Sequence, residues 1–194
     1  PRGLPVSRWL ERYASVFPTV ELNATFYKLP TKRAIERWRD ETPDDFVFAC
    51  KGSRYLTHLK RLRDTGQGIR RYFDLVEGLG EKLGPILFQL PPQMSRPDVD
   101  RLAAFLAELP PHHAYAFEFR HPAWYTSEVC ALLDEYGIAF CEHDLLPLGP
   151  PRLTGSFRYL RFHGAGAKYA GRYGKLALVP VAADLRRTER RGVD

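Results

Sequence analysis

The sequence lacks any apolar run close to the roughly 20 residues that a membrane-spanning helix needs. Its first residues, 1–5, also lack the apolar core of a signal peptide. Low-complexity segments and internal repeats are missing as well. We therefore expect no membrane partner and a cytoplasmic location.

Cysteine is scarce, with only Cys50, Cys130 and Cys141 among 194 residues. The three are odd in number, widely spaced and surrounded by apolar residues, which is unlike a disulfide framework or a zinc site. We expect buried, reduced thiols and no structural metal held by them.

Nucleotide-binding and metal-binding motifs are also missing. No Gly-x-Gly-x-x-Gly motif follows a predicted strand, and no Gly-Lys-Ser/Thr phosphate loop is present. The chain has no His-x-His or His-Glu-x-x-His spacing. We therefore expect no cofactor and no metal.

The composition is that of one globular domain with a sizeable core: 44% of the residues are hydrophobic, 27% are charged and 13% are aromatic. The net charge of +6 would favour a polyanionic partner. Much of the excess lies in two clusters, at 60–71 and 186–191. Solvated helix faces explain both clusters equally well.

The clearest pattern in the chain is a short strand at 115–120 that ends in a polar cluster. Side chains alternate along a strand, so Glu118 and Arg120 share one face while aromatic residues occupy the other. His121-Pro122 then ends the strand. An edge strand with a solvated face would also give this pattern, and it is the alternative.

Helices and strands alternate along the chain. The apolar spacing predicts strands at 19–27, 46–51, 85–92, 115–120, 138–144 and 157–162, with helices at 5–17, 31–42, 69–83, 97–109 and 126–136. Thr31 is the predicted N-cap of the second helix, and Thr126 or Ser127 is that of the last. This order is typical of parallel strands joined by crossover helices. Polar residues at several strand ends favour an α/β fold of the TIM-like (β/α) barrel type, whose ligand cavity lies at the C-terminal rim. A doubly wound sheet is the alternative fold.

The residues predicted at this rim suit a small anionic (phosphate- or carboxylate-bearing) or sugar-like ligand. Cationic side chains would hold the anion and a carboxylate or histidine would act as acid or base. The catalytic candidates are Glu118, Glu21 and His163. The ligand-binding candidates are Asn23, Lys51, His58, Gln89, Arg120, His121, Trp124, Arg161 and Tyr169.

Several other interpretations remain open. A metal-dependent isomerase or hydrolase could draw on Glu21, Glu118, Glu142, Asp144 and His163. Paired carboxylates could serve glycoside cleavage. A nucleic-acid-binding protein could use the basic loop at 54–71.

Structural roles for the same residues are a further alternative. Glu118–Arg120 and Glu142–Arg161 could be buried ion pairs. His58 and His121 could anchor loops, and Trp124, Tyr169 and Tyr173 could simply cover the barrel mouth.

At these strand ends the sequence resembles the YecE-like proteins, a family catalogued as domain of unknown function 72. The matching segments are 21–27, 48–51 with Thr57-His58, 83–85 with 89–92, 118–121 with Trp124, and 161–164 with Lys168-Tyr169 and Tyr173. The resemblance implies a TIM-like barrel, while the reaction of the family is not established.

Both ends of the chain depart from the family pattern. The family's usual first strand, with a Gly-Thr-Ser-Gly-Trp-like turn, has no counterpart, and neither does its Asn-Asn-like ending. We therefore expect one YecE-like domain at 1–174, a divergent basic tail at 175–194, and a barrel that is incomplete at its first strand and its C-terminal end. Unpaired strand edges would make such a chain unstable or dependent on association.

Overall fold

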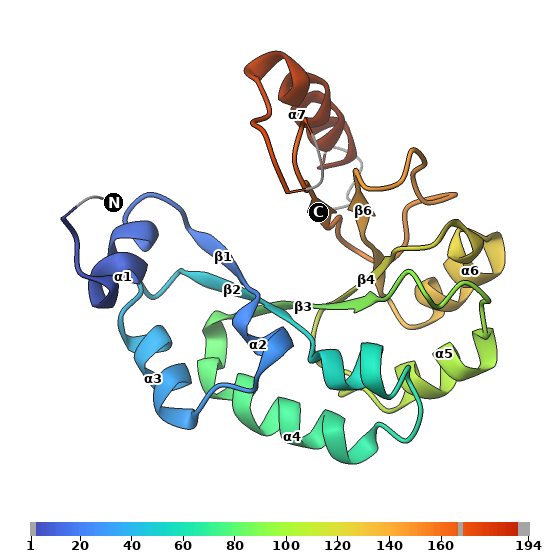
Figure 1. The fold of residues 1–194 in the computed structure, drawn as a ribbon, viewed down its shortest axis with the longest axis horizontal. Helices are drawn as coiled ribbons and strands as arrows, with labels where there is room; N and C mark the ends of the chain where they lie inside the picture. The colour runs from blue at the N-terminus through green and yellow to red at the C-terminus, as the bar shows by residue number, and fades with distance from the viewer. Residues whose placement is uncertain (1–2, 167–168, 190–194) are drawn as a thin grey trace. The chain divides into compact units, whose positions relative to one another are not determined.

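The computed structural model of the chain describes residues 3–166 and 169–189 (Figure 1). The fold is mixed α/β, and its main sheet has five parallel strands in the order β1-β2-β3-β4-β5, while β6 and β7 form a second, two-stranded sheet. Two compact units make up the chain. Unit 1 comprises Pro1–Gln89 and Arg101–Tyr115, and unit 2 comprises Leu90–Asp100 and Ala116–Asp194.

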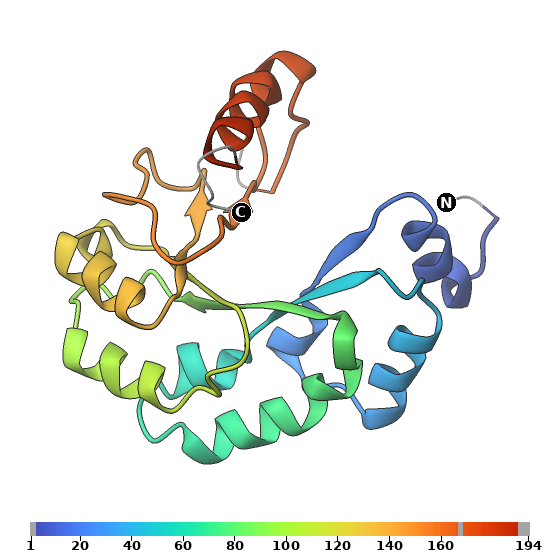
Figure 2. The same ribbon diagram turned by 180° about the vertical axis from the view of Figure 1, so that it is seen from behind.

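Unit 1 is built on β1 (Thr19–Leu22), β2 (Val47–Lys51) and β3 (Leu83–Leu90). The pairing is parallel, with Leu22 opposite Cys50 and Cys50 opposite Ile86. Two helices, α3 (Lys32–Asp40) and α4 (Gly66–Val76), lie on the same side of these strands (Figures 1 and 2). Phe48, Ile86 and Phe88 are fully buried and form the centre of this packing.

The remaining helices of unit 1 are short. They are η1 (Val6–Arg8), α1 (Trp9–Ala14), α2 (Ala24–Tyr27), the π-helix η2 (Tyr55–Leu59), the 3-10 helix η3 (Glu77–Lys82) and α5 (Val99–Ala107), whose first two residues belong to unit 2. The predicted cap of α3 is confirmed, because the Thr31 hydroxyl accepts a hydrogen bond from the Ala34 amide at 3.2 Å.

Two predicted boundaries in unit 1 are wrong. The strand predicted at 19–27 ends at Leu22, and α2 follows because Asn23 adopts helical backbone angles. The Thr25 hydroxyl lies 2.8 Å from the Leu22 carbonyl and 2.6 Å from the Lys51 carbonyl, which ties this turn to β2. The helix predicted at 69–83 ends at Val76 and continues as the 3-10 segment 77–82, inside which Gly80 has a φ of 59° that breaks the regular backbone.

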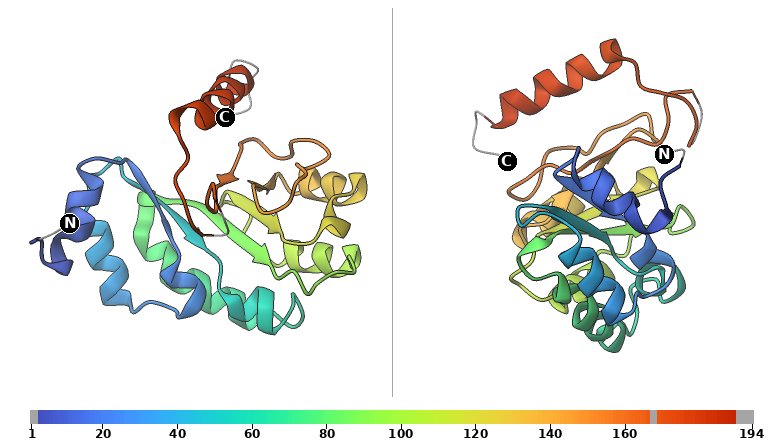
Figure 3. Two further views of the ribbon diagram at one scale, coloured as in Figure 1. Left: turned by 45° about the horizontal axis from the view of Figure 1, so that its top comes forward. Right: turned by 90° about the vertical axis from the view of Figure 1, so that its left-hand side faces the viewer.

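Unit 2 contains two short parallel pairs of strands. They are β4 (Tyr115–Phe119), whose first residue belongs to unit 1, with β5 (Ala139–Phe140), and β6 (Glu142–His143) with β7 (Leu160–Arg161). Its helices are η4 (Pro122–Trp124), α6 (Ser127–Glu135) and α7 (Lys175–Glu189). Of the two predicted caps, Thr126 is the one that caps α6, with its hydroxyl 3.2 Å from the Val129 amide, and Gly137 at φ 65° follows the helix. Helix α7 lies on the side of β6 away from α6 (Figure 3).

The strand predicted at 157–162 is reduced to Leu160–Arg161, and α7 lies in the predicted tail, where a helix face was considered only for the basic cluster at 186–191. The predicted closed barrel is not confirmed: the described strands form an open sheet with β1 at one end and β5 at the other. The division at residue 174 between a domain and a tail stays a prediction.

The three cysteines are free and buried, as predicted. Burial raises the pKa of the Cys50 thiol to about 12 and also raises the pKa of Cys130. Within residues 3–166 and 169–189, no helix is long and apolar enough to cross a membrane.

Candidate functional site

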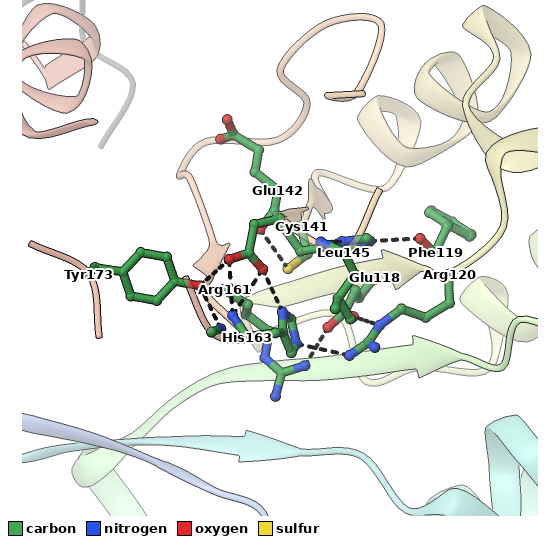
Figure 4. A network of polar contacts seen from close by, with 12 residues as sticks. Glu118, Phe119, Arg120, Cys141, Glu142, Leu145, Arg161, His163 and Tyr173 are labelled. Carbon is green, nitrogen blue, oxygen red and sulfur yellow. Dashed lines mark hydrogen bonds and ion pairs between the residues drawn. The ribbon is translucent and has the colours of Figure 1, made fainter. Parts of the chain in front are cut away.

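The candidate site of unit 2 is centred on the Glu118 carboxylate, which β4 places between two arginines (Figure 4). Its Oε1 accepts a hydrogen bond from Arg120 Nε, and its Oε2 accepts one from Arg161 Nη1 at 2.5 Å. Glu118 is fully buried, and the side chains of Arg120 and Arg161 are 7% and 13% exposed. One buried carboxylate therefore fixes two guanidinium groups.

His163 extends this cluster toward the surface. Arg120 Nη2 lies 2.9 Å from His163 Nε2, and His163 Nδ1 lies 3.1 Å from Asp144 Oδ1. Arginine can only donate, so Nε2 must accept and the ring proton lies on Nδ1, where it is donated to Asp144. The Tyr173 hydroxyl donates to Asp144 Oδ2. The site thus holds a neutral imidazole in one tautomer.

The pKa of His163 is lowered to about 4, first because the ring is buried and then because Arg120 and Arg161 oppose a further positive charge. The hydrogen bond to Asp144 acts in the opposite direction. Burial alone would raise the pKa of Asp144, but hydrogen bonds from Tyr173 and His163 bring it below its usual value. The dyad is therefore a neutral histidine beside an ionised aspartate.

This depressed pKa predicts an acid-sensitive contribution to stability. Above a pH of about 6.5 His163 is neutral in both the folded and the unfolded chain. As the pH falls from about 6.5 to about 4, only the unfolded chain gains the proton, so up to about 3 kcal/mol of unfolding free energy should be lost. Urea unfolding of the native chain and of His163→Gln at several pH values measures this loss.

The variant should lose less stability than the native chain over that interval. His112→Gln is the matched control, because the His112 side chain is 66% exposed. Parallel pH profiles for the native chain and His163→Gln would contradict the assignment.

A second ion-pair network joins β6 to α7. Arg158 donates to both Glu142 oxygens, at 2.8 Å and 2.7 Å, and to Asp184 Oδ2 at 2.7 Å. The predicted pairing of Glu142 with Arg161 is wrong, because Arg158 takes Glu142 and Arg161 takes Glu118. In Figure 4 the Glu142 carboxylate points away from the Glu118 cluster.

A cavity of about 600 Å³ lies between β6, β7, the segment at 146–149 and α7. The charged residues that line it are three arginines and three acids, namely Arg158, Arg161, Arg187, Glu142, Asp144 and Asp184. Leu146, Leu148 and Pro180 supply apolar wall. Arg161 and Asp144 belong both to this wall and to the Glu118 cluster, so the cavity adjoins the cluster.

Two other predicted residues of unit 2, His121 and Trp124, have well-defined packing. His121 Nδ1 accepts a hydrogen bond from the Ala123 amide at 3.2 Å. This contact is the one expected if His121 anchors the loop. Trp124 is 1% exposed, stacks on Phe119 and donates to the Met94 carbonyl at 2.6 Å. This geometry disfavours a ligand contact by Trp124, although the binding role of each residue stays a prediction.

Tyr169 is the exposed exception, with 69% of its surface accessible. Its ring lies 5.8 Å from that of His163, and its side chain forms a hydrogen bond with Arg120. It therefore borders the cluster, as the rim hypothesis expects. Lys168, which precedes it in the family's motif, lies outside the described residues.

The other five predicted residues belong to unit 1. Lys51 is 7% exposed, and its ammonium group lies 4.2 Å from the centre of the Phe26 ring. His58 packs edge-on against the same ring and contacts the Thr57 hydroxyl at 2.9 Å. Asn23 is exposed, Glu21 is half-buried and Gln89 is buried. A single cavity shared by these residues and the Glu118 cluster stays a prediction.

The basic loop predicted at 54–71 is largely helical, because η2 and the start of α4 occupy it. Nucleic-acid binding by this segment stays a prediction.

Arg158 and Asp184 were not among the predicted site residues. Arg158 lies within the predicted strand at 157–162, and a charged residue two positions before Leu160 on the same face was a signal that it needed a partner. Asp184 offered no such signal, since it lies before the basic cluster at 186–191 and in no predicted element.

The comparisons with known proteins identify the family. The sequence profile described as protein of unknown function DUF72 matches residues 1–194. The UPF0759 protein YecE of Escherichia coli K12 is 34% identical over 116 residues, which are 60% of this chain and 43% of that protein. The UPF0759 protein YunF of Bacillus subtilis is 35% identical over 43% of this chain and 32% of its own length. The match thus spans less than half of the length of these relatives.

Solved structures show the same fold. A DUF72 family protein from Thermotoga maritima aligns with a TM-score of 0.85 and 30% identity, covering 98% of this chain and 81% of that one. A DUF72 family protein from Enterococcus faecalis aligns with a TM-score of 0.81 over 96% and 84% of the two chains, at 19% identity. With a profile match over its whole length and these relatives, the chain belongs to the YecE-like DUF72 family.

Proposed function

We propose that unit 2 binds a small ligand that carries both an anionic group and hydroxyl groups, such as a sugar phosphate, in the cavity beside α7. The observation that supports this best is the position of Arg161, which lines the cavity while Glu118 holds its Nη1 atom. An arginine fixed in this way presents donors to phosphate or carboxylate with little loss of side-chain entropy on binding.

The acidic residues that line the cavity are the reason to expect hydroxyl groups on the ligand. Glu142, Asp144 and Asp184 supply carboxylate oxygens, which accept hydrogen bonds and suit the O–H donors of a sugar. A wall of arginines alone would favour a polyanion. Three acids beside three arginines favour a ligand with one anionic group on a polar, uncharged body.

Glu118 and His163 are both occupied as proton acceptors. Both oxygens of Glu118 already accept from arginines, and Nε2 of His163 accepts from Arg120 while its Nδ1 proton is donated to Asp144. The proposal is therefore one of ligand binding, with these two residues holding Arg120 and Arg161 in place.

Calorimetric titration with glucose 6-phosphate, glucose and inorganic phosphate tests the proposal. We expect glucose 6-phosphate to bind more tightly than either of its parts. Arg161→Lys keeps the charge but loses the planar fork, so the affinity should fall by about tenfold or more. The control is Arg37→Lys, an exposed arginine on α3, which should leave the affinity unchanged.

Absence of binding by all three probes at millimolar concentration would contradict the proposal. Equal affinity of the native chain and Arg161→Lys would remove Arg161 from the site.

A further inference from the structure

A second polar cluster lies in unit 1 and has no part in the proposed ligand site. Glu77 begins η3, immediately after α4, and His112-His113 lie in the turn before β4. Within the described residues this is the group of histidine, cysteine and acidic side chains whose ligand atoms converge, all lying within 4.8 Å of one another.

The distances in the cluster suit one metal ion. Glu77 Oε1 lies 2.9 Å from His113 Nε2 and 3.6 Å from His112 Nε2. A tetrahedral zinc ion with bonds near 2.0–2.1 Å requires ligand atoms about 3.3 Å apart. Each observed separation differs from this value by a few tenths of an ångström, which small rotations of the side chains can supply.

The packing around the cluster holds two of the three ligands in place. The His113 ring stacks on Phe73 of α4, with ring centres 5.2 Å apart and planes 18° apart, and the side chain is 14% exposed. Glu77 directly follows that helix. His112 is 66% exposed and lies 4.2 Å from His113 between ring centres, so it can close on an ion without disturbing the core.

We propose that Glu77, His112 and His113 bind a divalent transition-metal ion of the zinc class. Two imidazoles and one carboxylate form a set that zinc, cobalt and nickel prefer, whereas magnesium and calcium prefer oxygen ligands alone. Three protein ligands leave a fourth position for water or a substrate oxygen, and the exposure of Glu77 and His112 leaves that position open to solvent.

The site departs from the expectation that the chain has no metal. That expectation rested on the absence of the His-x-His and His-Glu-x-x-His spacings, in which the histidines lie two or four positions apart. Here the carboxylate and the histidines lie more than 30 positions apart, and the fold brings them together.

Equilibrium dialysis of the full chain against Zn²⁺ tests the site. We expect one ion per chain, and Glu77→Gln and His112→Ala should each weaken this binding by about tenfold or more. The matched control is Glu81→Gln, because Glu81 is an exposed glutamate in the same helix. The zinc affinity of this variant should equal that of the native chain. Native-like zinc affinity in Glu77→Gln and His112→Ala would overturn the proposal.

Two further measurements do not depend on the variants' stability. Zinc at roughly 100 times its Kd should raise the melting temperature of the native chain by about 5–10 °C and leave that of Glu77→Gln unchanged. Co²⁺ bound to the native chain should give the intense visible absorption of a four-coordinate ion. A melting temperature insensitive to zinc, or only the weak spectrum of hydrated Co²⁺, would overturn the proposal.

Discussion

Replacing Glu118 by glutamine is expected to lower the free energy of unfolding by about 3–5 kcal/mol. The carboxylate is fully buried and accepts hydrogen bonds from Arg120 and Arg161, so its loss leaves two nearly buried guanidinium groups without their shared counter-charge. Glutamine keeps the shape of the side chain, and the change therefore reports charge rather than volume. Urea unfolding at pH 7, followed by circular dichroism, measures the difference.

Glu11→Gln is the matched control for this prediction. Glu11 also pairs with an arginine, Arg8, but its side chain is 57% exposed, and surface pairs of this kind contribute about 0–1 kcal/mol. A loss below about 1 kcal/mol for Glu118→Gln would show that the buried cluster contributes no more than a surface pair.

Replacing Trp124 by alanine should destabilise the chain by a similar amount, about 3–5 kcal/mol, while leaving the affinity for glucose 6-phosphate unchanged. The indole is buried, stacks on Phe119 at 5.1 Å between ring centres, and donates to the Met94 carbonyl. Unfolding by urea and calorimetric titration at a temperature where both proteins are folded measure the two effects.

Trp124→Phe separates stacking from hydrogen bonding. It keeps an aromatic ring against Phe119 but leaves the Met94 carbonyl unpaired, so we expect a smaller loss of about 1–3 kcal/mol. Trp9→Ala is the control, because Trp9 is 49% exposed and should change stability far less. A tenfold loss of ligand affinity in Trp124→Phe would restore the ligand contact first predicted for this residue.

The sequence was most informative where local rules suffice. Alternation of side chains was enough to place Glu118 and the aromatic residues of β4, and the hydroxyl residues Thr31 and Thr126 marked two helix starts correctly. Each of these features depends on neighbours within about four positions along the chain. Such neighbours are visible without any knowledge of the fold.

Pairings between distant segments could not be predicted in the same way. The pairing of Glu142 shows the reason, because β6 and β7 align Glu142 with Leu160 and His143 with Arg161. Glu142 therefore faces the side of β7 that carries Arg158, while Arg161 points to the other side and reaches Glu118. A register shift of one residue would have reversed this choice, and nothing in the sequence specifies the register.

The prediction for the turn after β1 was wrong for a different reason. Residues 19–27 alternate as a strand would, but the hydroxyl of Thr25 bonds to carbonyls of Leu22 and Lys51, and the second of these lies on another strand. A tertiary contact thus overrides the local pattern. The cluster of Glu77 with His112-His113 was hidden likewise, because η3 and the turn before β4 meet only in the folded chain.

The buried cysteines can serve as chemical probes of local unfolding in each unit. A thiol reacts with an alkylating reagent as the exposed thiolate, and Cys50 is shielded from both solvent and ionisation. Cys50 lies in unit 1, whereas Cys130 and Cys141 lie in unit 2. Because a buried thiol is modified only while its surroundings are transiently open, the labelling rates of these positions give separate opening equilibria for the two units without any engineered probe.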